Sequence, residues 1–344
     1  MKYHCLAWLA CPDCGGDLRF TDLPKYPHEG KDLQEGTLAC AGCGRTFELI
    51  DGIPQLYPKG RAESGVTRTQ QSFAWEWLRY PGSLEEDPEV FLEETQVPRA
   101  DWAGKVVLDA GCGMGRYTAV ALGLGAEAVA FDLSASITRL IGLAKKQPKL
   151  HLVQGDLHRP PFKKGVFDIV YSQGVLHHTS DTRKAFDAVA PLVREGGRLS
   201  VWLYGRPGSW ESFSTNPLKS TRSWLKRVLP LVWLLVWVRL VFSDFVRVFT
   251  VVLPMNLLYA LCFPLAWLGA VPLFKYLTFS VHRDRRVRLI ENFDWLAPPF
   301  QFKHTKEELR AWFSAAGIEV ESQLPHGVVP KVGMLGRKPL RRRS

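Results

Sequence analysis

The sequence predicts an α/β protein built on a mainly parallel sheet, with a small N-terminal module and a largely helical insert. From residue 103 onward, apolar strand-like segments alternate with helical segments, as in a parallel sheet covered by helices on both faces. Two C-x2-C pairs occupy the first 58 residues, and residues 248–274 form a 27-residue run without a charged side chain. These features predict a module at 1–58, a linker and helical cap at 59–102, and a main domain at 103–338. An insert at about 206–304 interrupts that domain, and a basic tail follows at 339–344.

The composition allows a large core and places the charge unevenly. Of the 344 residues, 46% are hydrophobic and 23% are charged, which is ordinary for a globular protein. The formal net charge is +10, and residues 219–288 alone contribute +9. Such a basic segment suits an anionic partner, either a membrane surface or a nucleic acid. The seven cysteines are odd in number and include paired C-x2-C spacings, which favours a reducing, cytoplasmic environment over a disulfide framework.

The N-terminal module has the ligand pattern of a structural zinc site. The ligands are four cysteines, Cys11, Cys14, Cys40 and Cys43. Four thiolates in two pairs suit tetrahedral zinc and leave no open position for a substrate, so we expect a structural and not a catalytic metal. A glycine follows each pair, at Gly15 and Gly44, and permits a tight backbone turn around the metal.

The N-terminal segment CPDCGG…LACAGCGRTFELIDGIPQLYP resembles the Trm112-like zinc-ribbon family across roughly residues 7–58. All four cysteines of that family's pattern are present. The resemblance implies a small module that partners methyltransferases, here fused into the same chain.

The main domain begins with KVVLDAGCGMGRYT at residues 105–118, an apolar strand followed by a glycine-rich turn and a helix. The glycine spacing is G-x-G-x-G and therefore differs from the G-x-G-x-x-G of dinucleotide-binding enzymes, which argues against that alternative. Asp109 precedes the turn, Asp132 ends the second strand, and Asp156 ends the third. An acid at the end of the second strand is placed to accept hydrogen bonds from both hydroxyls of a ribose.

These residues resemble the class I methyltransferases that use S-adenosylmethionine, over about 103–206 and again from 300 to 338. The resemblance implies a Rossmann-like seven-stranded sheet, completed by the helix of HTKEELRAWFSAAG, with a capping box from Thr305 to Glu308, and by two final strands. It also implies the cofactor-binding residues, which are Asp109, Gly111, Gly113, Asp132, Leu133, Asp156, Leu157 and Gln173.

The candidates for acid–base work lie at the carboxyl ends of the fourth and fifth strands. They are His178, His177 and Tyr204. The motif VLHHT resembles one in which the second histidine faces the pocket, which favours His178, but one or both histidines hydrogen-bonding to loops is an equal alternative. A base is required only if the acceptor must lose a proton. The segment at 69–80 either caps the cofactor or packs as an ordinary helix, and Asp294 either lies near the pocket or caps a turn.

The insert has three interpretations. A single membrane crossing conflicts with the sheet elements that follow it, and Pro254, Pro264 and Pro272 predict short helices instead. The other two are a helical cap buried against the main domain and an interfacial hairpin flanked by basic residues, and both can hold together. We therefore expect a methyltransferase acting on a small or lipid-like acceptor, with peripheral contact to the cytoplasmic face of a membrane through residues 219–288. One alternative is an RNA methyltransferase that uses the zinc ribbon for substrate binding. The absence of the Asn/Asp-Pro-Pro and Pro-Cys motifs argues against it. The other alternative is a cofactor-binding scaffold without enzymatic activity.

Overall fold

The computed structural model describes residues 1–21, 33–58, 60, 64–80, 82–206, 223–272, 274–280, 282–324 and 331–340. The end of the expected basic tail, residues 341–344, and the basic residues Lys219 and Arg222 lie outside the described residues.

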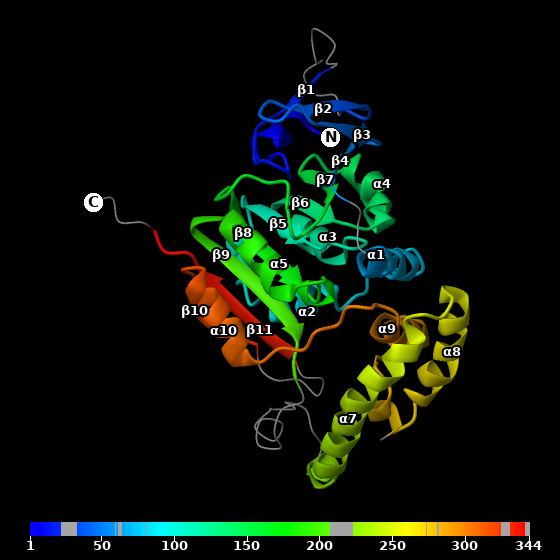
Figure 1. Ribbon diagram of the computed structural model, residues 1–344. Helices are drawn as coiled ribbons and strands as arrows, with labels where there is room; N and C mark the ends of the chain where they lie inside the picture. Colours follow the sequence, from blue (N-terminus) through cyan, green and yellow to red (C-terminus); the bar gives the residue numbers. More distant parts are fainter. Residues whose placement is uncertain are drawn as a thin grey trace.

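The described strands form one continuous sheet in the order β1-β2-β3-β4-β7-β6-β5-β8-β9-β11-β10 (Figure 1). The N-terminal module supplies β1 (Leu18–Phe20), β2 (Gly36–Cys40), β3 (Thr46–Ile50) and β4 (Ile53–Leu56). The main domain supplies β5 (Val106–Ala110), β6 (Glu127–Asp132), β7 (Leu150–Gly155), β8 (Phe167–Gln173), β9 (Val193–Tyr204), β10 (Glu319–Gln323) and β11 (Lys331–Arg337). Strands β5 to β9 pair in parallel, and β11 pairs antiparallel with β9, as the sequence predicts.

Helices cover both faces of this sheet because its central strands are buried on both sides. On one face α5 (Thr182–Val189) and α10 (Lys306–Ala315) pack through Phe186 and Phe313. On the other face lie α2 (Asp87–Thr95), α3 (Arg116–Gly123) and α4 (Ile141–Ala144). The expected capping box of α10 is present, since Thr305 and Glu308 each accept a hydrogen bond from the other's backbone N–H.

The N-terminal module is joined to the main sheet, which the sequence does not reveal. Strand β4 pairs in parallel with β7 at Gln55–Gln154 and Leu56–Gly155. Nearby, both His4 and His151 lie with Nε2 at 2.9 Å from Glu127 Oε1, so a hydrogen-bonded group also ties the module to β6 and β7. The edge strand β7 is thereby covered, which removes an unpaired sheet edge.

The insert consists of α7 (Ser223–Thr250), α8 (Met255–Leu268) and α9 (Arg285–Leu296), and α1 (Ser64–Trp77) packs against α9. In Figure 1, α7 and α8 project beyond the sheet and α9 lies between them and the rest of the molecule. The expectation that prolines cut the insert into short helices is wrong in part. Pro254 is the N-cap of α8, but Pro264 lies inside α8 and Pro230 inside the 28-residue α7. None of the described helices meets the length and apolarity needed to cross a membrane.

The insert has one buried face and one exposed face. Val236, Leu240 and Cys262 pack inward in one cluster with Tyr204 and Trp295. The basic residues do not all form a surface, contrary to the sequence-based expectation. Arg239, Arg247 and Arg288 are buried, and each donates to backbone carbonyl groups inside the insert or the segment after α9. These three guanidinium groups therefore hold the insert together and are withdrawn from any anionic partner.

Candidate active site and metal centre

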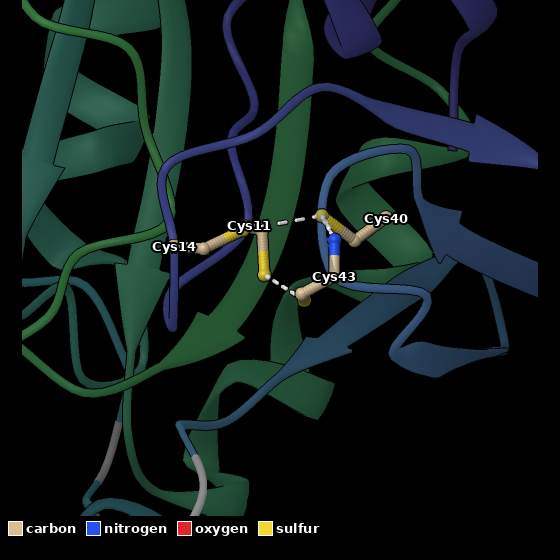
Figure 2. Close-up of side chains that lie close together, drawn as sticks. All are labelled: Cys11, Cys14, Cys40 and Cys43. Atoms are coloured by element: carbon tan, nitrogen blue, oxygen red, sulfur yellow. Dashed lines mark hydrogen bonds between the residues drawn. The ribbon is translucent and has the colours of Figure 1, made fainter.

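The four predicted metal ligands converge from two loops of the N-terminal module (Figure 2). Their sulfur atoms all lie within 4.8 Å of one another, with Cys11–Cys43 at 3.8 Å and Cys14–Cys40 at 3.4 Å. Tetrahedral zinc with Zn–S bonds of about 2.3 Å requires sulfurs about 3.8 Å apart, so the four side chains fit the ion.

The surroundings of the four sulfurs also fit a structural metal. The backbone N–H groups of Gly42 and Cys43 donate to Cys40 Sγ at 3.4 Å and 3.5 Å, as donors around a thiolate should. Gly15 and Gly44 adopt φ of +75° and +71°, a conformation that L side chains rarely adopt. The ligands and turns predicted from the sequence thus form one compact site.

All eight predicted cofactor-binding residues line a single cavity of about 700 Å³. They are Asp109, Gly111, Gly113, Asp132, Leu133, Asp156, Leu157 and Gln173. They come from the carboxyl ends of β5, β6, β7 and β8, which meet at one edge because these strands are parallel. We call this part of the cavity the cofactor half.

The glycine-rich turn keeps the cofactor half open. A Cβ on Gly111 would lie 2.3 Å from Val175, and φ at this position is +95°. A Cβ on Gly113 would lie 3.1 Å from the ring of Trp77 in α1. A side chain at either position would therefore press against Val175 or Trp77, both of which line the cavity.

The acids of the cofactor half are held by nearby donors. Asp132 accepts from the backbone N–H groups of Gly113 at 2.8 Å and Ser134 at 2.7 Å. The carboxylate lines the cavity at the end of β6, the position from which an acid can accept the hydroxyls of a ribose. Asp109 accepts from the hydroxyl of Thr118 at 2.6 Å, and burial raises the pKa of Asp109 to about 7.

Two further groups support a polar ligand here. Gln173 donates through Nε2 to Ser200 Oγ at 2.8 Å, while its Oε1 is buried without a hydrogen-bond partner in the described part of the chain. Asp156 accepts from the backbone N–H of His158 at 2.8 Å. The residues present therefore fit S-adenosylmethionine, the group that the sequence resemblance implies. When bound, it supplies an activated methyl group.

The other end of the cavity, the acceptor half, is built by α1, α9 and the end of β9. Its residues include Glu76, Trp202, Tyr204, Phe279, Glu291, Asp294 and Trp295. Helix α1 also contributes Thr69, Gln70, Phe73 and Trp77, so the segment at 69–80 both packs as a helix and covers the cavity. Of the two positions expected for Asp294, the structure shows the one near the pocket and not the turn cap. The sequence does not predict Glu76 as a site residue, because its place in the cavity depends on the packing of α1 against α9.

The three candidate catalytic residues differ in position. His178 lines the cavity, and its Nδ1 donates to the carbonyl of Phe300 at 2.9 Å, which leaves Nε2 as the free nitrogen. Burial lowers the pKa of His178 to about 3. His177 is fully buried behind it, outside the cavity lining, and burial holds its pKa well below the usual range. Tyr204 lines the cavity and donates to Asp294 at 3.3 Å.

Comparison with known proteins identifies the two parts of the chain. Residues 108–201 match the family model of a methyltransferase domain, and residues 2–52 match that of Trm112p-like proteins. The chain carries a methyltransferase domain preceded by a Trm112-like domain.

Relatives of the methyltransferase domain include two enzymes named for quinone biosynthesis. A demethylmenaquinone methyltransferase of Mycolicibacterium vanbaalenii is 36% identical over 126 residues, which cover 36% of this chain and 50% of that protein. A ubiquinone biosynthesis O-methyltransferase of Xanthomonas oryzae pv. oryzae is 35% identical over 111 residues, covering 31% and 46%. The chain thus spans about half the length of these relatives.

Solved structures with a similar fold include a 1,6-didemethyltoxoflavin-N1-methyltransferase of Burkholderia thailandensis, at 13% identity and a TM-score of 0.43 over 89% of this chain and 100% of that chain. Another is the complex of the Haloferax volcanii Trm112 methyltransferase activator with a methyltransferase, at 11% identity and a TM-score of 0.41 over 80% and 100%.

Proposed function

We propose that this protein transfers a methyl group from S-adenosylmethionine to a small, lipid-like acceptor. The observation that carries the proposal is that one cavity holds both halves: eight cofactor-type residues at strand ends and a largely aromatic acceptor half next to them. Methyl transfer from a sulfonium needs mainly alignment of donor and acceptor, and a continuous cavity supplies it. The names of the quinone-pathway relatives support an acceptor of lipid-like character.

We also propose that the outer face of the insert contacts a membrane. On α7, exposed apolar side chains recur at helical spacing, with Phe242, Phe245 and Phe249 each at least 59% exposed, and Val252, in the turn after the helix, is 77% exposed. On α8, Trp267 is 60% exposed and Arg285 lies over its ring at 4.6 Å. Exposed apolar side chains with the guanidinium group of Arg285 on the same insert suit the boundary between acyl chains and anionic headgroups. The unpaired thiols of Cys112 and Cys262 suit a cytoplasmic, reducing location for this contact.

Labelling of cell fractions tests the activity. The purified protein is incubated with methyl-labelled S-adenosylmethionine and separate lipid, RNA, protein and small-molecule fractions. We expect label in the lipid or small-molecule fraction, and much less label with the Asp132→Ala variant when the cofactor concentration is low. Label in RNA alone would replace this proposal with the RNA alternative.

Vesicle flotation tests the membrane contact. We expect binding to vesicles that contain anionic lipid, and weaker binding by a Phe245→Ser, Phe249→Ser variant. Leu340→Ser is the matched control, because Leu340 is 73% exposed but lies near the C-terminus, in the segment that follows β11. Loss of self-association in the double variant, with no vesicle binding by the original protein, would assign these exposed apolar side chains to contact between copies of the chain instead.

A further inference from the structure

Three acidic side chains gather in the acceptor half of the cavity. Glu76 comes from α1, and Glu291 and Asp294 lie one turn apart on α9. Glu76 is only 4% exposed, and Glu291 and Asp294 are partly exposed to the cavity. Buried acids are rare in proteins unless they are paired or functional, so this group calls for a chemical explanation.

Asp294 lies at the centre of this group. Its Oδ2 accepts from the hydroxyl of Tyr204 at 3.3 Å, and its Oδ1 is enclosed without a hydrogen-bond donor among the described residues. Glu76 is its carboxyl neighbour, and burial holds the pKa of Glu76 well above the usual range. Two carboxyl groups that meet in a buried place share one proton, which gives each a partner.

A group that accepts a proton near neutral pH must have a pKa near that range. The pKa of Asp294 is raised to about 7, chiefly by burial and also by the charge of Glu291, against the lowering effect of hydrogen bonds from Glu76 and Tyr204 and of the charge of Arg247. These side chains come from α9, α1, β9 and α7, the elements around Asp294. His178, with its pKa of about 3, is a much weaker base at neutral pH.

The wall beside Asp294 is aromatic. The rings of Tyr204 and Trp295 stack at 4.6 Å with 27° between their planes, and Trp295 and Phe279 stack at 5.2 Å with 8°. All three side chains line the cavity. Aromatic side chains pack against a planar acceptor ring in stacked or edge-to-face geometry, and a hydroxyl on that ring would lie beside the acid group.

We propose that the acceptor is a planar ring bearing a hydroxyl, and that Asp294 is the catalytic residue that takes the hydroxyl proton. Glu76 and Tyr204 are positioning residues. The hydroxyl O–H bond breaks and its proton passes to Asp294, while the acceptor oxygen forms a bond to the methyl carbon. The carbon–sulfur bond breaks, and its electron pair stays on the sulfur, which becomes a neutral thioether. This inference rests on the proposed methyl transfer and names its acceptor class and its base.

The first test uses Asp294→Asn, which keeps the shape of the side chain and removes the basic oxygen. The probe acceptor is a catechol with an alkyl tail, and the matched control is Glu307→Gln on the exposed surface of α10. We expect kcat to fall about 10²- to 10⁴-fold in Asp294→Asn and to stay unchanged in the control. Affinity for S-adenosylmethionine, measured by calorimetry, should be the same in all three proteins.

The second test asks whether the loss concerns a proton. A nitro-substituted catechol is already ionised at a pH of about 8, so it needs no base. We expect the loss in Asp294→Asn to shrink to a few-fold on this acceptor. The rate with the alkyl catechol should rise with pH through about 7 in the original protein, because Asp294 must be ionised to act, and this rise should disappear in Asp294→Asn.

The third variant separates positioning from catalysis. In Glu76→Leu the hydrogen bond that lowers the pKa of Asp294 is lost, so the pKa of Asp294 should rise. We expect the rise in rate to move to higher pH while the rate at high pH is retained. A merely structural role for Glu76 would leave the position of this rise unchanged.

Three outcomes would overturn the inference. Asp294→Asn retaining activity within about three-fold, or losing it equally on both catechols, would remove Asp294 as the base. Methylation of cationic amines in preference to catechols would make the acid group an ammonium-binding site. The proposed function itself fails in a different way: the original protein would bind no S-adenosylmethionine or transfer no methyl group to any fraction.

Discussion

The two halves of the cavity are built by different kinds of structure. In the cofactor half, Asp132 accepts from two backbone N–H groups of its own neighbouring turns. In the acceptor half, Asp294 has the hydroxyl of Tyr204 as a donor and Glu76 as a second acid beside it. The first half comes from successive strand ends, and the second from α1, β9 and α9, which are far apart in the sequence. Local turns therefore fix one half, and tertiary contact between distant helices fixes the other.

This difference separates binding from reactivity. In the cofactor half, hydrogen bonds from backbone N–H groups oppose the rise in pKa that burial causes at Asp132, which favours its ionised form and suits constant recognition of a cofactor. In the acceptor half, burial raises the pKa of Asp294 to about 7, which suits proton exchange near neutral pH. We therefore expect damage to the cofactor half to appear mainly as lost affinity, and damage to the acceptor half mainly as lost rate.

Removal of zinc should have the largest effect and should act on the cofactor half. Structural zinc contributes about 10 kcal/mol or more to the folding of small zinc modules, so a chelator should unfold the Trm112-like domain. Because β4 pairs with β7 beside Asp156, the cofactor half loses a neighbouring strand. Hydrogen exchange should show lost protection in β1 to β4 and β7, while α9 stays protected.

Two controls accompany the chelation experiment. Cys262→Ala changes a buried cysteine in α8 outside the four-cysteine site and should leave the zinc content unchanged. Cys14→Ser should lower the zinc content and reproduce the loss of protection. Equal loss of protection in α9 would contradict the division of the cavity into two separately supported halves.

Asp132→Ala should have the next largest effect and should be confined to binding. Two hydrogen bonds to a carboxylate are lost, at about 1.5 kcal/mol each, so affinity should fall on the order of 100-fold. Calorimetry with S-adenosylhomocysteine measures this without turnover. Asp294→Asn is the comparison variant and should bind the same ligand within about two-fold. A similar loss of affinity in both variants would remove the distinction between the halves.

The residues that the sequence predicts for the cofactor half come together in one cavity because their sequence signals are local. Asp109, Asp132 and Asp156 each follow a strand whose apolar pattern is readable, and parallel pairing brings strand ends together. The four zinc ligands are readable for the same reason, since each pair spans one turn. The capping box of α10 is equally local.

The acceptor half and the insert are less predictable because tertiary packing decides them. The sequence gives Glu76 no feature that distinguishes it from an ordinary residue of a surface helix. In the structure, α9 packs against α1 and Glu76 is buried. Arg239, Arg247 and Arg288 read as basic surface, yet carbonyl groups of the folded insert accept their hydrogen bonds. Pro264 reads as a helix end, but α8 continues through it. The pairing of β4 with β7 cannot be predicted from the sequence, because it joins the edge strand of the N-terminal module to the edge strand of the main-domain sheet, and neither strand carries a motif for that pairing.

The smallest expected effect is on stability, where one acid from each half should respond to pH. The pKa of Asp109 and that of Asp294 are both raised to about 7, mainly by burial. In the unfolded chain both are ionised well below neutral pH, so the folded empty protein loses stability as pH rises through 7. Between pH 6 and pH 8 each group should lower the free energy of unfolding by about 1 kcal/mol. Asp109→Asn and Asp294→Asn should each remove one such contribution, as measured by urea unfolding at the two pH values.

Added S-adenosylmethionine should then distinguish the two acids. The methionine part of the ligand carries positive charge and, by the family resemblance, contacts Asp109. The bound ligand should therefore favour the ionised form of Asp109. The contribution of Asp109 to the pH dependence of the free energy of unfolding should then disappear. Asp294 lies in the other half and should keep its contribution, so the saturated protein should lose about half of the pH dependence seen in the empty one. If the ligand removes both contributions equally, the two acids share one electrostatic environment. In that case the contrast between a binding half and a reactive half is wrong.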